Sequence, residues 1–211
     1  YPTLTLGEDT FVFDTVASMV KLGHDVDVIT SNQLPLIGGA RQLTTEEAEA
    51  RLGGGVLHEH AFVKVIPTLD SVSSIRRIIG NCDVLYVKNE IFELVPLKIL
   101  RGSKTPTVCG IHTSVSYPYA PTLRAKLHNR IYRSAFYRQL LNQCDLIHVL
   151  NSTDLDLMMA HFRIEEQRVC SVPIGIDAQE FRPLVTPRTN NKTRILFVGR
   201  LDEHKGFDIL Y

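Results

Sequence analysis

The sequence lacks an excess of charge of either sign, because 23 lysine and arginine residues balance 23 aspartate and glutamate residues. A protein dedicated to nucleic acid normally carries a clear basic surplus, so no nucleic-acid partner is expected. No apolar run approaches the roughly 20 residues that a helix needs to cross a bilayer, and no secretory signal pattern is present. We therefore expect a cytoplasmic protein.

Cysteine is scarce, and its spacing excludes the common zinc motifs. No Cys-x-x-Cys pair and no Cys/His cluster occurs. The four cysteines are Cys82, Cys109, Cys144 and Cys170. We expect small buried thiols in a reducing compartment.

Acidic metal motifs are also missing from suitable loops. The Asp-x-Asp triplet at 25–27 falls in an expected strand, and the triplet at 154–156 falls at an expected helix start. Both are interpreted as structural. We predict no metal and no cofactor.

What the sequence does contain is an alternation of apolar runs with amphipathic stretches, which is typical of βαβ units and a mainly parallel sheet. Strands are expected over 25–31, 56–66, 82–87, 105–113, 145–150, 168–176 and 194–199, and helices over 10–22, 71–80, 93–102, 121–143 and 154–162. Gly23 can end the first helix. The region 36–55, a short polar helix between glycine clusters, is expected to be a mobile surface insert.

The polar segment 182–193, "RPLVTPRTNNKT", has the composition of a linker. We therefore predict a domain over 1–183, a linker over 184–193, and the beginning of a second α/β domain over 194–211.

The segment "VGRLDEHKG" offers Arg200 and Lys205 directly after an expected strand. Ligands of open α/β sheets bind beyond the carboxyl ends of strands. The two cations could neutralise a diphosphate, with Arg as a planar fork and Lys as a point charge. The alternative is a solvated loop with ordinary surface charges.

Several motifs in fixed order resemble the retaining, GT-B-fold glycosyltransferases of family four. They are "LGEDTFVFDTVASMVKLGHDVDVIT", "CDVLYV", "TPTVCGIHT", "CDLIHVLNSTD", "VPIGIDAQEFRP" and "RILFVGRLDEHKGFDIL". The set covers nearly the whole chain. The resemblance implies a Rossmann-like α/β N-terminal domain that binds the acceptor, followed by the start of a nucleotide-sugar-binding domain.

The resemblance also assigns residues. Arg200 and Lys205 would grip the donor diphosphate and stabilise the leaving group without a metal. Gly7 would let the donor approach the opening loop. Asp9 stands where the family has glutamate, and is assigned to the acceptor side or the cleft. His112, after a strand, would lie close to the transferred sugar as a positioning group.

Three departures from the family pattern accompany these assignments. Leu6 replaces the first glycine of the opening loop, Asp9 replaces its glutamate, and Ile174 replaces the usual asparagine of the joint before the linker. They affect the path of the opening loop and one polar contact at the joint.

Two further features concern the acceptor. Asn89 and Glu90 follow a strand and could meet it at the same sheet edge. The segment 121–141 is basic and amphipathic, with an apolar i, i+4 stripe of Leu123, Leu127, Ile131 and Ala135. It could lie on an anionic membrane or pack as an ordinary helix with a solvated basic face, which we favour.

The predicted reaction transfers a sugar, with retention of configuration, from a nucleotide-diphosphate sugar to a saccharide, lipid-linked or small-molecule acceptor. We expect these 211 residues alone to be inactive. The family's first strand is expected to be absent, leaving the sheet vacant or closed around that position. A non-catalytic GT-B-like glycan-binding or partner subunit remains an alternative. A dinucleotide oxidoreductase is disfavoured, because no G-x-G-x-x-G turn follows a strand.

Overall fold

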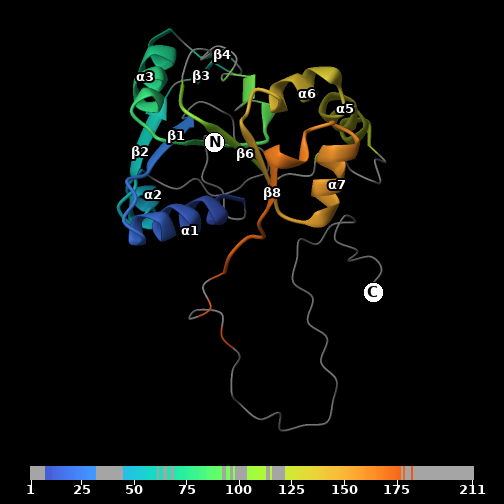
Figure 1. Ribbon diagram of the computed structural model, residues 1–211. Coiled ribbons are helices and arrows are strands. Elements are labelled where there is room, and N and C mark those ends of the chain that lie inside the picture. Colours follow the sequence, from blue (N-terminus) through green and yellow to red (C-terminus); the bar gives the residue numbers. More distant parts are fainter. Residues whose placement is uncertain are drawn as a thin grey trace. The chain divides into compact units, whose positions relative to one another are not determined.

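The computed structural model describes residues 8–31, 45–60, 62–63, 66–67, 69–91, 94–95, 97, 104–112, 115, 122–176, 178 and 182 (Figure 1). The chain divides into two compact units, Tyr1–Ile174 and Gly175–Tyr211. The predicted linker and second-domain strand lie outside the described residues, as do Gly7, Arg200 and Lys205.

The first unit is a mixed α/β fold with parallel sheets flanked by helices, which confirms the predicted Rossmann-like class. Its strands are β1 (Asp27–Ser31), β2 (Val56–His60), β3 (Phe62–Val63), β4 (Ile66–Pro67), β5 (Leu85–Lys88), β6 (Thr107–Ile111), β7 (Leu146–Val149) and β8 (Val169–Ser171). Its helices are α1 (Glu8–Lys21), α2 (Thr45–Arg51), α3 (Leu69–Gly80), α5 (Leu123–Tyr132), α6 (Ala135–Leu141), α7 (Ser152–Ala160) and the 3-10 turn Glu166–Arg168.

Strands β1 and β2 form a parallel pair with its own small core. Phe13 and Val16 of α1 are buried against Ala48 and Leu52, which lie in and just after α2. The prediction of a surface insert over 36–55 is therefore wrong for α2. The segment is mainly polar in sequence, but its apolar residues Ala48 and Leu52, one helical turn apart, pack against α1.

The predicted strand 56–66 is interrupted. After β2, a short antiparallel pair forms in which Phe62 lies opposite Pro67. The single strand that the sequence indicated therefore divides between the parallel β1–β2 pair and the separate β3–β4 pair.

Strands β5, β6, β7 and β8 form a four-stranded parallel sheet in that order (Figure 1). The register places Val87, Cys109 and Ile147 side by side on one face. That face meets the main core, whose buried members are Leu94, Cys109, Ile111, Val115, Tyr132, Tyr137, Leu140, Leu141, Cys144, Ile147, Val149, Met158, Phe162 and Ile164. The opposite face carries Tyr86, Gly110 and His148, because side chains alternate along a strand.

The predicted helix 121–143 is two helices. Ser134 begins α6 by accepting a hydrogen bond at its hydroxyl from the main-chain N–H of Tyr137. This N-cap satisfies a donor that an uninterrupted helix would satisfy with its backbone. The break lets α6 bury Tyr137, Leu140 and Leu141.

The break also changes how α5 packs. Ala125 and Tyr132 are buried, whereas Leu123, Leu127 and Ile131 are 83%, 55% and 37% exposed. The apolar stripe read from the sequence thus does not pack against the core.

Among the described residues, β1 and β5 belong to different sheets. Helix α3 packs against both, since its buried Ile75 and Ile79 contact Ile29 and Leu85. No helix in the described part of the chain is both long and apolar enough to cross a membrane.

Candidate functional site

The site lies where β5, β6 and β7 end side by side. Asn89 follows the last residue of β5, and His112 follows the last residue of β6. Ligands of open α/β sheets bind beyond this edge, where successive loops converge. The sheet therefore brings together two residues that the sequence singled out separately.

Asn89 is fully buried and joins the two strand ends. Its side-chain oxygen accepts a hydrogen bond of 3.1 Å from the main-chain N–H of His112. Its own carbonyl accepts a 3.1 Å hydrogen bond from the hydroxyl of Tyr137. Burial raises the pKa of that hydroxyl well above its ordinary value, so it remains a donor. Asn89 thus fixes the backbone at the start of the loop that carries His112.

The imidazole of His112 lies within hydrogen-bond distance of a tyrosine. The hydroxyl of Tyr86 is 2.7 Å from Nε2 of His112 and 2.8 Å from Nδ1 of His148. We call Tyr86, His112 and His148 the three-ring cluster. Burial, followed by His148 and Lys88, lowers the pKa of His112 from 6.5 to about 4. His112 is therefore neutral at physiological pH.

Gly110 makes room for the three-ring cluster. A Cβ atom at this position would overlap the Tyr86 hydroxyl and the Nε2 atom of His112. Both overlaps are far closer than non-bonded atoms allow. The requirement for glycine in β6 is therefore steric: the tyrosine ring lies across the strand at this residue.

Glu90 follows Asn89 at the same edge of the sheet. One of its carboxylate oxygens accepts a 2.8 Å hydrogen bond from the hydroxyl of Tyr132 on α5. The Tyr132 ring stacks on His128 at 4.2 Å between centroids. Glu90 is thereby tied to α5. Its contact with an acceptor, like that of Asn89, remains a prediction.

Sequence reasoning missed Tyr86 and His148, although a signal was present. The two residues occupy the same position in the similar segments "CDVLYV" and "CDLIHV". Each is a polar-tipped residue between two apolar neighbours, and the two strands flank the one that contains Gly110. Polar residues on one face of the two strands that flank a strand glycine indicate a cluster over that glycine.

The remaining predicted site residues are placed only in part. Asp9 lies in the first turn of α1, while Gly7, Arg200 and Lys205 lie outside the described residues. Within the described ranges, no group of three or more His, Cys, Asp or Glu side chains is arranged to hold a metal ion.

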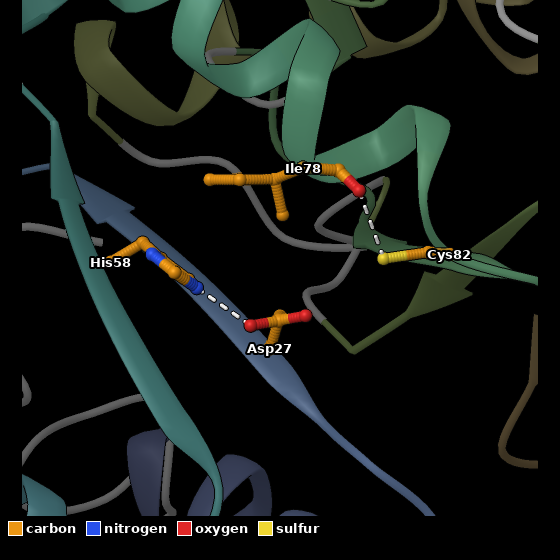
Figure 2. Close-up of polar contacts among 4 residues, drawn as sticks. All are labelled: Asp27, His58, Ile78 and Cys82. Atoms are coloured by element: carbon orange, nitrogen blue, oxygen red, sulfur yellow. Dashed lines mark hydrogen bonds and ion pairs between the residues drawn. The ribbon is translucent and has the colours of Figure 1, made fainter.

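A separate polar group lies between β1, β2 and the end of α3. Figure 2 shows the contact between the Asp27 carboxylate and Nε2 of His58, and the Cys82 thiol donating to the Ile78 carbonyl. The first contact is 2.6 Å long and the second 3.2 Å. Burial, then Asp27 and Asp83, raise the pKa of Cys82 above 9.0. Asp27 thus has a structural partner on the neighbouring strand, in line with the structural interpretation of the 25–27 triplet.

The fold is a Rossmann-like α/β domain with a polar edge at the carboxyl ends of its strands. Residues 7–180 match the family described as Glycosyltransferase Family 4. The chain belongs to this family, so its domain is of a sugar-transferring class. A search among curated proteins gave no match.

Proposed function

We propose that the chain forms the acceptor-side domain and the beginning of the donor-side domain of a retaining glycosyltransferase. The donor is a nucleotide-diphosphate sugar, and the reaction needs no metal. The observation that carries this proposal is the position of His112. A neutral imidazole stands at the carboxyl edge of β6, inside the range that matches the sugar-transferring family.

In this proposal, Arg200 and Lys205 hold the donor diphosphate, and Gly7 lies in the loop beside it. Asp9 lies on the acceptor side or in the cleft. Charge leaves with the nucleoside diphosphate as the sugar is transferred. Fixed cations at the diphosphate stabilise that charge in the transition state. The support is the Gly-Arg and Lys-Gly spacing of "VGRLDEHKG".

On the acceptor side, the proposal places Asn89 and Glu90 at the edge that receives a saccharide, lipid-linked or small-molecule acceptor. Asn89 holds the loop backbone through His112. A neutral His112 suits a transferring sugar, which gains positive character in the transition state, because a charged imidazolium would oppose it.

The test follows nucleoside diphosphate release by the full-length gene product, using a panel of nucleotide sugars and acceptors. We expect release with one donor class, an α-to-α or β-to-β product by NMR, and unchanged rates with EDTA. Inversion of the anomeric centre would overturn the retaining assignment. Loss of activity in EDTA that added divalent metal restores would overturn metal independence.

A second experiment tests the diphosphate residues. Arg200→Ala and Lys205→Ala should each weaken nucleotide-sugar binding about 10- to 100-fold, as expected for loss of a hydrogen bond to a charged group. Lys104→Ala, at an exposed position, is the matched control. Equal affinities for all three variants would contradict the assignment. Donor binding without any transfer would favour a non-catalytic partner subunit.

We also propose a peripheral contact of α5 with the cytoplasmic, anionic face of a membrane. Leu123, Leu127 and Ile131 form an exposed apolar stripe, and the adjoining basic residues Lys126, Arg130 and Arg133 are exposed too. Apolar insertion and attraction to anionic lipids act together in such helices.

Vesicle sedimentation tests this contact. The protein should bind phosphatidylglycerol vesicles more than phosphatidylcholine vesicles, and Leu127→Ser should reduce binding several-fold. Leu22→Ser, which changes a 77% exposed leucine just after α1, should leave binding unchanged. Equal binding by both variants would rule out insertion by α5.

A further inference from the structure

The three-ring cluster continues into the backbone. Beyond Tyr86, the Nε2 atom of His148 lies 2.7 Å from the carbonyl oxygen of Val172. Each pair of rings in the cluster has a centroid separation between 5.9 and 6.1 Å. A continuous chain of hydrogen bonds therefore runs from the Val172 carbonyl through His148 and Tyr86 to His112.

The carbonyl end fixes the direction of this chain. A carbonyl oxygen only accepts, so Nε2 of His148 carries the proton. In neutral His148, Nδ1 is then an acceptor, and the Tyr86 hydroxyl donates to it. The Tyr86 oxygen is left to accept from His112, which places the His112 proton on Nε2.

The proton on Nε2 also determines the state of the other ring nitrogen of His112. Its Nδ1 atom then carries a lone pair and is out of reach of solvent. Protonation of His148 would reverse both hydrogen bonds at the Tyr86 hydroxyl and move the His112 proton to Nδ1, while Nε2–H of His148 would still donate to the Val172 carbonyl. Besides the Tyr86 hydroxyl, His148 on β7 and Lys88 on β5 act on His112, and both lower its pKa.

We propose that Tyr86 and His148 are positioning residues that hold the imidazole of His112 as the neutral Nε2–H tautomer. The role of His112 in sugar transfer rests on the function proposed above, whereas the tautomer does not. In this state Nε2–H is engaged by Tyr86, so the ring does not serve as the base that deprotonates an acceptor hydroxyl. Its contribution is a fixed, uncharged group at the carboxyl end of β6.

Long-range ¹H–¹⁵N NMR of the histidine rings tests the tautomer directly at pH 7.5. We expect a protonated, pyrrole-type Nε2 and an unprotonated, pyridine-type Nδ1 in both His112 and His148. In Tyr86→Phe, the two nitrogens of His112 should shift toward each other as the preference is lost. Tyr132→Phe, which removes a hydroxyl bound to Glu90 instead, should leave the His112 signals unchanged.

Two results would overturn the proposal: an Nδ1–H His112 in the native protein, or an unchanged His112 pattern in Tyr86→Phe. Gly110→Ala should displace Tyr86 and reproduce the effect of Tyr86→Phe. Gly80→Ala, with nothing within 4 Å of the added Cβ, is its control. Tyr86 is 42% exposed, so the phenylalanine variant retains the fold and keeps the test decisive.

Activity measurements separate this proposal from the proposed function. In the full-length gene product, Tyr86→Phe should lower kcat about five- to tenfold, the effect of about one hydrogen bond, with KM little changed. If the NMR pattern is as expected but no sugar transfer exists, the tautomer stands and the function fails. If transfer exists and Tyr86→Phe leaves kcat unchanged, the function stands and the positioning role fails.

Discussion

The side-chain oxygen of Asn89 accepts a hydrogen bond from the main-chain N–H of His112, 23 positions further along the chain. Because Asn89 is fully buried, water cannot replace it as the acceptor. The Asn89 side chain therefore holds the ends of β5 and β6 together beyond their last paired residues, Lys88 and Gly110.

Replacing Asn89 by alanine should cost about 1–3 kcal/mol of unfolding free energy, because the partly buried main-chain N–H of His112 loses its acceptor. Urea unfolding followed by circular dichroism measures this loss. The matched control is Asn81→Ala, at an exposed turn after α3, which should change stability by less than about 0.5 kcal/mol. Equal midpoints for the two variants would show that the Asn89 bond contributes nothing.

The lowered pKa of His112 predicts a loss of stability in mild acid. The unfolded chain takes up a proton near pH 6.5, whereas folded His112 does so only near pH 4. Stability should therefore fall as pH drops from about 6.5 to about 4, and the contribution of His112 should be constant outside this window.

Unfolding free energies at pH 7, 6, 5 and 4 measure this dependence. His112→Asn should flatten the profile, while His24→Gln, at an exposed turn, should leave it unchanged. A His112→Asn variant with the native pH profile would refute the assignment of this effect to His112.

The raised pKa of Cys82 predicts slow alkylation. Asp27 disfavours the thiolate, so Asp27→Asn should lower the pKa and speed the reaction of Cys82 with iodoacetamide severalfold at pH 8. Mass spectrometry of the labelled peptide gives the rate. Asp25→Asn, an exposed change two residues earlier, should have a smaller effect. A native rate in Asp27→Asn would leave burial and Asp83 as the causes of the raised pKa.

Gly23 ends α1 in a left-handed conformation with φ of 90°. Its N–H bonds the Val20 carbonyl, and the next N–H, from His24, bonds the Met19 carbonyl, which together form a Schellman motif. Gly23→Ala should cost about 1 kcal/mol, since a Cβ is disfavoured there. Thermal unfolding should show a lower Tm than for Gly80→Ala, where φ is ordinary.

Local signals predicted the elements well. The apolar spacing before Gly23 predicted α1 and its end. The expected helix over 154–162 corresponds to α7, which Asn151 caps by accepting from the Asp154 N–H at 2.9 Å. These features depend on residues a few positions apart, which a sequence displays directly.

Features that depend on distant residues were missed. Tyr86 and His148 are 62 positions apart and meet only because β6 carries a glycine between them. The break at Ser134 was hidden because its flanks continue a helical apolar pattern. The burial of Ala48 depends on α1, which no periodicity within α2 reveals.

The division of the sheet between β1 and β5 has a consequence for cooperativity. Within the described residues, the two halves share no ladder, and the buried contacts between them include Ile75 and Ile79 of α3 with Ile29 and Leu85. Subglobal opening would then follow this boundary. Amide hydrogens of the β1–β2 pair would exchange with solvent before those of β6 and β7. Ile79→Ala would increase this difference in exchange rate, because it loosens α3, the helix that packs against both sheets.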